Sequence, residues 1–223
     1  MSSAHTKSNH ELVELSLFPL NLVLFPGMSL PLRIFEERYK LMISECLEKN
    51  LPFGVVLIKE GMEVGGLAEP HKVGTTARII KSERQEGGQY SLQTIGEKRF
   101  GIHQITQETP FLVGKVEYLE DEVPNGLGNI VTKTRKMLGS YWKALASIKG
   151  GWIREVQTPE DPVSLSYAIA QSVAMPALVG QYLLQMSSVK ERMERATPLL
   201  QERLDMAQKK LQKLLPYQGP RLN

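Results

Sequence analysis

The chain has 223 residues, of which 42% are hydrophobic and 23% are charged, and its formal net charge is +3. This length allows one large domain or two small ones with a buried core, and the small net charge gives no sign of nucleic-acid binding. The only cysteine, Cys46, excludes an intrachain disulfide. No stretch approaches the roughly 20 apolar residues that span a bilayer, and the N-terminus lacks a signal peptide. These features predict a soluble, cytoplasmic protein.

The N-terminal part of the chain begins with a polar tail and continues into an apolar ribbon. Residues 1–11 carry too little apolar surface to be buried, and we expect them to be disordered. The stretch Leu15–Ile34 is rich in Leu and Ile but contains Pro19, Pro26 and Pro31. Because proline lacks an N–H and disfavours helical geometry in the residue before it, this stretch is predicted to form short extended pieces joined at bends.

An amphipathic helix is predicted to follow the ribbon. From Tyr39 to Leu47, apolar residues recur at i, i+3, i+4, i+7 and i+8, while charged residues occupy the other face. Cys46 lies on the apolar face and is interpreted as a small core residue. A bent apolar ribbon that leads into a one-sided helix is typical of a helix packed against a curled sheet.

Five further stretches have the composition of β-strands, at residues 53–58, 73–84, 89–95, 99–105 and 111–119. Gly87-Gly88 joins the second and third, which predicts a hairpin with a polar tip. Residues 59–72 contain three glycines and show no period, so we expect a long loop there, suited to carry binding. Six or so short strands with one helix argue for a curled or partly closed β-barrel.

The second half of the chain has helical periodicity. Residues 120–128 are acidic and then rich in Pro, Gly and Asn, as expected for a connection between domains. Apolar spacing and capping signals then predict four helices, at about residues 130–148, 162–173, 177–186 and 188–214. Thr158 and Asp161 are both suitable N-cap residues for the second of them. The last helix carries a seam that fits either internal packing or pairing with a second copy, made of Leu200, Leu204, Ala207, Leu211 and Leu214.

The predicted elements divide the chain into five parts. These are a disordered tail (1–11), a β subdomain (12–122), a linker (123–128), a helical bundle subdomain (129–215) and a C-terminal tail (216–223). Strands come first and helices follow, so the fold class is predicted to be α+β.

An ordered series of motifs runs through both halves. It comprises Phe18-Pro19-Leu20, Val23–Gly27, Pro31–Phe35, Val73–Ile79, Asp161-Pro162 and Val189–Arg192. Over about residues 13–215, these motifs resemble the N-terminal substrate-binding domain of Lon proteases. The resemblance implies an N-terminal PUA-like β pseudobarrel with one packed helix, followed by a C-terminal helical bundle.

The sequence contains no constellation that would carry catalysis. It has no G-x-x-x-x-G-K-[ST] phosphate loop and no G-x-S-x-G elbow. The Ser-Lys dyad of Lon proteases belongs to a peptidase module that this sequence does not include. Four scattered histidines without H-E-x-x-H, and one cysteine, argue against a zinc site. We therefore expect a non-enzymatic protein with no catalytic residue, cofactor or metal.

Seven residues are candidates for contact with a client polypeptide: Arg33, Phe35, Glu36, Tyr39, Phe100, Trp142 and Trp152. Arg33 and Glu36 lie where the ribbon meets the helix, so they fit either a cleft or a solvated pair worth about 0–1 kcal/mol. Trp142 and Trp152 fit either an apolar anchor or packing in the core. Packing is the simpler interpretation for both.

Two functions of different classes follow. The resemblance implies a non-catalytic module that binds peptides or unfolded proteins, such as an adaptor or holdase, with apolar surface in a groove between barrel and bundle. Its partners would be unfolded or misfolded polypeptides or a partner protein, and a homodimer through the C-terminal helix is compatible with the seam. The alternative is an RNA-binding module, because PUA-like barrels elsewhere bind RNA. The basic residues are spread out and lack interleaved aromatic residues, which argues against it.

Overall fold

The computed structural model describes residues 11–66, 68–151 and 155–214 and divides into two compact units. Unit 1 comprises Met1–Glu120 and Pro176–Gln185, and unit 2 comprises Asp121–Met175 and Met186–Asn223. Apart from Glu11, the two predicted tails lie outside the described residues. The α+β class predicted from the sequence is confirmed, since the described strands all lie in unit 1 and unit 2 is helical.

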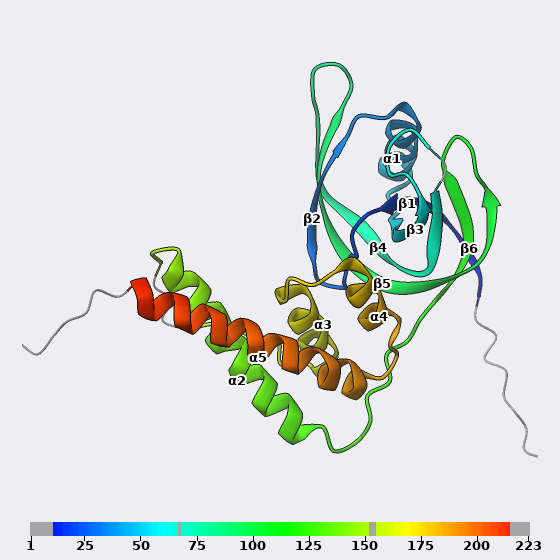
Figure 1. Cartoon of the computed structure of the whole chain (residues 1–223). Coiled ribbons are helices and arrows are strands. Elements are labelled where there is room, and N and C mark those ends of the chain that lie inside the picture. Colours follow the sequence, from blue (N-terminus) through cyan, green and yellow to red (C-terminus); the bar gives the residue numbers. More distant parts are fainter. Residues whose placement is uncertain (1–10, 67, 152–154, 215–223) are drawn as a thin grey trace, which may run out of the picture. The chain divides into compact units, whose positions relative to one another are not determined.

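Six strands form the sheet of unit 1: β1 (Val13–Leu20), β2 (Ser29–Ile34), β3 (Phe53–Gly61), β4 (Ala68–Arg84), β5 (Tyr90–Gln107) and β6 (Leu112–Tyr118). Their order is β2-β5-β4-β3-β1-β6, and β6 also pairs with β5. The second pairing closes β1, β3, β4, β5 and β6 into a ring, with β2 attached outside it along β5 (Figure 1). The curled, barrel-like sheet expected from the sequence is therefore present.

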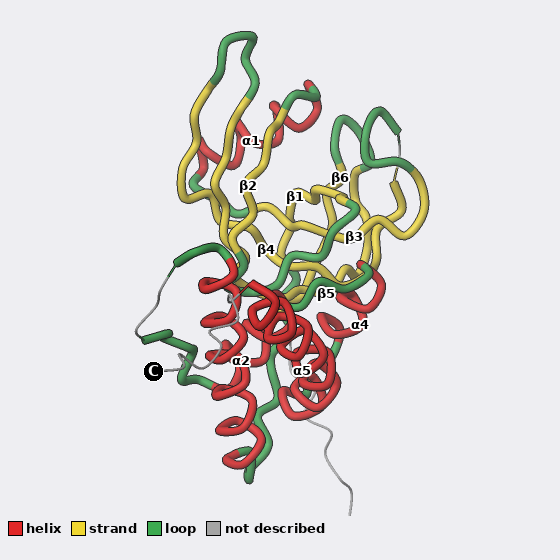
Figure 2. The backbone as a smooth tube through the Cα atoms, turned by 60° about the vertical axis from the view of Figure 1, so that its left-hand side comes forward, coloured by secondary structure: helices red, strands yellow, loops and turns green. Residues whose placement is uncertain are grey.

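The length of β5 makes this closure possible. Its first half pairs with β2 and its second half pairs with β6, while β4 runs along much of its other edge. Register shifts interrupt the β4–β5 and β5–β6 ladders, and such irregularities bend a strand and increase its twist. Figure 2 shows the β4–β5 hairpin extending away from the rest of the sheet.

Helix α1 (Glu37–Lys49) packs on this sheet as its period predicts. Tyr39, Met42, Ile43 and Cys46 are buried in one cluster with side chains from the strands, among them Phe53. The helix ends at Asn50, which adopts left-handed geometry with φ of 51° and donates its backbone N–H to the last turn. The chain then enters β3 directly.

Helix α4 (Ala177–Gln185) belongs to unit 1, so the expected continuous helical subdomain 129–215 is interrupted there. The Gln181 side chain donates from Nε2 to the carbonyl of Val73 on β4 at 2.9 Å. Arg99 of β5, which is 2% exposed, donates from Nη1 to the carbonyl of Leu184 at 2.9 Å. A methyl group added at Gly180 would be in ordinary van der Waals contact with Val23, 3.6 Å from its Cβ. Helical periodicity predicts α4 itself but cannot indicate which unit it joins.

Unit 2 is built from α2 (Gly128–Ile148), α3 (Pro162–Ser172) and α5 (Val189–Leu214). Asp161 caps α3, since its carboxylate accepts from the backbone N–H of Ser164 at 2.7 Å. These hydrogen bonds from the first turn outweigh burial and lower the pKa of Asp161. Helices α2 and α5 run side by side in both views (Figures 1 and 2). The seam of α5 packs internally at Leu200 and Leu204, whereas Leu214 is 55% exposed.

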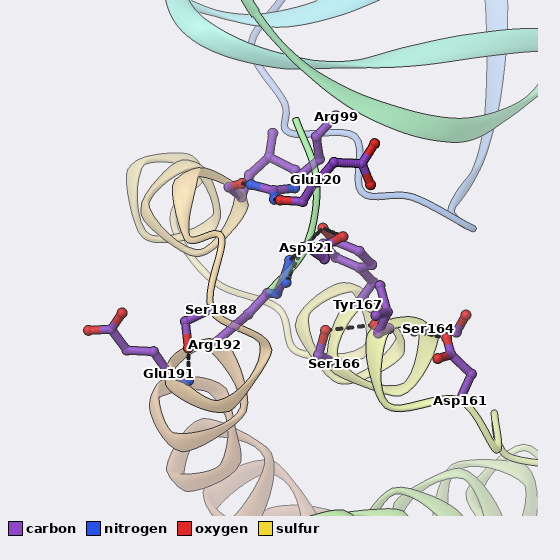
Figure 3. Close-up of polar contacts among 12 residues, drawn as sticks. Arg99, Glu120, Asp121, Asp161, Ser164, Ser166, Tyr167, Ser188, Glu191 and Arg192 are labelled. Atoms are coloured by element: carbon purple, nitrogen blue, oxygen red, sulfur yellow. Dashed lines mark hydrogen bonds and ion pairs between the residues drawn. The ribbon is translucent and has the colours of Figure 1, made fainter. Parts of the chain in front are cut away.

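A buried polar cluster ties the start of unit 2 to α5 and α3 (Figure 3). Arg192 has no exposed surface, and its Nη1 lies 3.0 Å from Oδ1 of Asp121. The Tyr167 hydroxyl donates to the same carboxylate at 2.8 Å, and the Arg192 guanidinium lies 4.0 Å from the Tyr167 ring centroid. Each of these three side chains thus has a polar partner, as buried polar side chains generally do.

One expectation about local structure is corrected. Strand β3 extends to Gly61 and β4 begins at Ala68, so the long loop expected at 59–72 is replaced by a short connection, of which the structure describes residues 62–66. Pro198 lies inside a continuous α5. None of the described helices has the length and apolar character required to cross a membrane.

Candidate functional site

Glu36 connects the start of α1 to the β3–β4 loop. Its Oε2 accepts from Arg38 Nε at 3.0 Å and from the backbone N–H of Gly65 at 3.2 Å. Arg38 in turn donates from Nη1 to the carbonyl of Gly66 at 2.8 Å. The sequence suggested a pair between Arg33 and Glu36, but the partner of Glu36 is Arg38, and Arg33 is exposed on β2 opposite Ser91. These contacts give Glu36 a structural role in holding the loop.

Tyr39 is a core residue. It is 4% exposed, and its ring centroid lies 4.3 Å from that of Phe18. The Arg38 guanidinium lies 4.5 Å from the Tyr39 ring centroid. Burial raises the pKa of the Tyr39 hydroxyl, and the positive charge of Arg38 opposes the rise without cancelling it. The expected client contact is therefore corrected: Tyr39 anchors α1 to the sheet.

The remaining candidates are dispersed. Phe100 has no exposed surface, so it packs in the core rather than contacting a client. Trp142 lies in unit 2 and donates from Nε1 to the Ser172 hydroxyl at 3.0 Å. Trp152 lies outside the described residues. Phe35 is 50% exposed, and Met62 and Val64 on the β3–β4 loop are also exposed. Of the seven residues, Phe35 is the apolar one that unit 1 presents at its surface.

A groove in unit 1 offers a better formed site. Two adjoining cavities, of about 500 Å³ and 250 Å³, lie between α1, the first half of β1 and the segment Leu51-Pro52 that precedes β3. We call this the α1–β1 groove. The residues that line both cavities are Glu14, Leu15, Ser16, Glu45, Lys49 and Leu51. The larger cavity is also bounded by the β5–β6 hairpin, including Phe111, and the smaller by Tyr118.

One stripe of α1 forms a wall of the groove. Leu41, Glu45 and Lys49 recur at every fourth position and therefore share a face of the helix. This stripe lies beside the fully buried face rather than on it, so Leu41 stays 47% exposed. Leu51 follows the helix and is 54% exposed. The groove thus pairs two accessible leucines with a Glu45–Lys49 ion pair whose Nζ–Oε2 distance is 3.9 Å. Such a lining suits an apolar segment with polar flanks.

Cys46 borders the smaller cavity and provides a probe of it. Burial, and to a lesser degree the Glu45 carboxylate, raises the pKa of its thiol from 9.0 to about 11. Since the thiolate is the nucleophile, we expect iodoacetamide at about pH 8 to alkylate the native protein about 100-fold or more slowly than the urea-unfolded chain. Mass spectrometry will count a single adduct, because the chain has one cysteine. Equal rates in both states would show an open, ionised thiol instead.

Sequence reasoning missed the groove residues for a physical reason. Leu41 and Leu51 are apolar positions beside the predicted buried face and just past the helix end, and a single apolar residue at such a place is common on protein surfaces. The available signal is that Leu41 lies off the apolar period of the helix and that Leu51 lies beyond the helix end. What makes them a site is the packing of α1 against β1, which the linear pattern does not contain. Among the described residues, no group of His, Cys, Asp or Glu is arranged to hold a metal ion.

Comparisons with known proteins show which family this chain belongs to. Residues 14–202 match the family described as the ATP-dependent protease La (LON) substrate-binding domain. The Lon protease of Anaeromyxobacter dehalogenans is 26% identical over 197 residues, which cover 86% of this chain and 23% of the relative. That of Parabacteroides distasonis is 28% identical over 204 residues, covering 87% and 24%. The chain therefore spans about a quarter of the length of these relatives.

Solved structures agree with the family match. The crystal structure of a Lon N-terminal domain protein from Xanthomonas campestris covers 82% of this chain and 96% of its own, with a TM-score of 0.59 and 26% identity. The N-terminal domain of the Lon protease from Mycobacterium avium complex covers 85% and 99%, with a TM-score of 0.63. At 16% identity, the second likeness concerns the fold alone.

Proposed function

Since this chain belongs to the Lon substrate-binding domain family, we propose that its unit 1 recognises substrates by binding segments of unfolded polypeptide in the α1–β1 groove. The observation that carries this proposal is the groove itself, a concave site of about 500 Å³ with Leu41 and Leu51 accessible on its walls. Concave sites of this size with apolar walls and a few polar groups are typical of ligand binding. The role is recognition without catalysis, as in an adaptor or holdase.

Burial of apolar side chains would supply most of the affinity. Removing apolar surface from water contributes about 25 cal/mol per Å², and the effect has no directional requirement. A groove with two exposed leucines would therefore accept many sequences with modest affinity, as a protein that surveys unfolded chains requires. The reducing cytoplasm fits the single free thiol and completes the proposal.

Charge substitutions on the groove walls test the proposal. We expect Leu41→Lys combined with Leu51→Lys to weaken binding of a fluorescent, permanently unfolded polypeptide about tenfold or more. Each leucine would otherwise bury surface worth about 1 kcal/mol, and 1.4 kcal/mol corresponds to tenfold in affinity. Both side chains are about half exposed, so the fold should tolerate the change. Fluorescence anisotropy at low and high salt gives the affinity.

Two matched variants make the test specific. Leu47→Lys introduces the same charge on α1 at an exposed position that does not line the groove, and it should leave binding unchanged. Phe35→Lys tests the apolar residue that the sequence indicated. Loss of binding in Phe35→Lys, with none in the groove variant, would move the site to the β3–β4 loop and overturn the groove assignment.

RNA binding remains the second candidate because of one feature, the charge of α2. This helix carries Lys133, Arg135, Lys136 and Lys143 and no acidic residue. Unit 1, which holds the sheet, has 13 Lys and Arg against 15 Asp and Glu, a net charge of −2. A phosphate backbone would therefore favour α2 over the sheet. A labelled RNA hairpin in the same titration, bound with a steep loss at high salt, would support this alternative.

A further inference from the structure

We propose that the polypeptide in the α1–β1 groove binds as an added β-strand along the open edge of β1 at Val13–Ser16. This inference rests on the proposed function and specifies its ligand: an extended segment with apolar residues at alternate positions and a cationic residue at the end nearest Glu14. Strand addition is a general way to bind extended chains, because backbone hydrogen bonds give affinity without fixing the sequence.

The open edge follows from the pairing of β1. Along Val13–Leu17, β1 pairs with β6 on one side. On its other side, pairing with β3 covers only Leu17–Leu20, beginning with Leu17 opposite Gly54. Among the described strands, none lies beside Val13–Ser16 on this second edge. In a strand, alternate residues direct their N–H and C=O groups to opposite edges, so this edge retains hydrogen-bonding groups.

Pro52 explains why β3 does not continue the ladder. Extending the β1–β3 register by two residues would place Leu15 beside Pro52. Proline has no N–H to donate, so it does not support a central ladder. The chain also leaves α1 at Asn50 with left-handed geometry, immediately before this point. The smaller cavity, about 250 Å³, lies here, lined by Val13, Leu15 and Pro52 among others. The structure thus leaves room beside the open edge.

The chemistry around the edge specifies the segment. Leu41, Leu51 and Phe111 line the larger cavity, so side chains on one face of the added strand would meet apolar walls. Lys49 already pairs with Glu45. Glu14 lines both cavities and is exposed, and among the described residues it forms no ion pair, although Lys115 lies opposite it on β6. A lysine or arginine of the bound segment would complement this carboxylate.

Backbone methylation tests strand addition directly. The probe is a fluorescent peptide of alternating valine and threonine with one terminal lysine, together with two analogues N-methylated at either set of alternate residues. In an added strand, the N–H groups of alternate residues point in opposite directions, so only one of the two sets faces the open edge of β1. We expect one analogue to lose about tenfold or more in affinity and the other to bind within about twofold of the parent. Equal affinities, or equal losses, would overturn strand addition.

The same experiment separates this inference from the function on which it rests. If Leu41→Lys with Leu51→Lys abolishes binding while both methylated analogues bind alike, the groove binds peptides but not as a strand. If the parent peptide and the unfolded polypeptide both fail to bind, the proposed function itself is wrong.

Replacing the terminal lysine by glutamate should weaken binding several-fold, and Glu14→Lys should reverse this preference. An unchanged preference in Glu14→Lys would overturn the role of Glu14, and Lys115→Glu serves as the control on the neighbouring strand.

Discussion

Replacing Asp121 with alanine is expected to destabilise unit 2 by about 3–5 kcal/mol, because it leaves the charge of Arg192 buried without its carboxylate. Arg192 has no exposed surface, and Asp121 is its ion-pair partner. The hydroxyl of Tyr167 also donates to this carboxylate, so the change removes two kinds of contact at once. Domains are stable by about 5–15 kcal/mol, and a loss of this size would leave unit 2 marginal.

Tryptophan fluorescence reports this effect selectively. Both tryptophans of the chain, at positions 142 and 152, belong to unit 2. Urea unfolding followed by their emission will therefore measure the unit that carries the cluster. Glu122→Ala is the control, because it also removes one negative charge, but from an exposed side chain at the next position in the chain. It should change the free energy of unfolding by no more than about 0.5 kcal/mol.

A double variant distinguishes two free energies: the cost of burying the Arg192 charge without its carboxylate, and the stability that the ion pair itself contributes. Asp121→Ala combined with Arg192→Met removes both charges, and an apolar replacement of a buried pair is often close to neutral. We expect it to recover a large part of the stability lost in Asp121→Ala. A double variant as unstable as the sum of two single variants would show that the pair itself supplies the stability.

The sequence predicted the elements better than their assembly. Period and caps predict α1, α2 and α3 within a few residues, and the N-cap of α3 is one of the two residues that the sequence offers for it. These features depend on contacts within a few positions along the chain. Closure of the sheet depends on β5 pairing with both β4 and β6, and the placement of α4 depends on Gln181 and Arg99 reaching distant carbonyls. Such contacts leave little trace in local pattern.

The candidate site shows the same division. The sequence indicated the junction between the ribbon and α1, and this junction does hold the β3–β4 loop through Glu36. It could not separate an aromatic residue that packs from one that stays at the surface, since Tyr39 and Phe35 lie on the same short stretch but are 4% and 50% exposed. The groove lies between α1 and the first half of β1, beside Pro52, where the β1–β3 ladder ends, so it is a property of three elements together.

Phe100→Ala is expected to destabilise unit 1 by about 3–5 kcal/mol and to leave the client affinity of the folded protein unchanged. The Phe100 ring fills space left by two glycines on neighbouring strands. A Cβ atom added at Gly54 would lie 2.6 Å from its Cζ, and one added at Gly74 would lie 2.7 Å from it. No side chain at either glycine can expand into the cavity that alanine would leave. The loss should therefore be near the upper part of the range for buried aromatic residues.

Hydrogen exchange of peptides from β3, β4 and β5 will measure this loss in unit 1, because tryptophan emission reports on unit 2. Phe35→Ala removes the same atoms from a half-exposed position and should cost about 0.5 kcal/mol or less. The affinity of Phe100→Ala for the unfolded polypeptide, corrected for the fraction of the variant that is folded, should match that of the parent protein. If Phe100→Ala instead kept its stability and lost binding, Phe100 would contact the client as its sequence position suggested. The two glycines argue against that result, because a ring packed into the space they leave has no face to offer a partner.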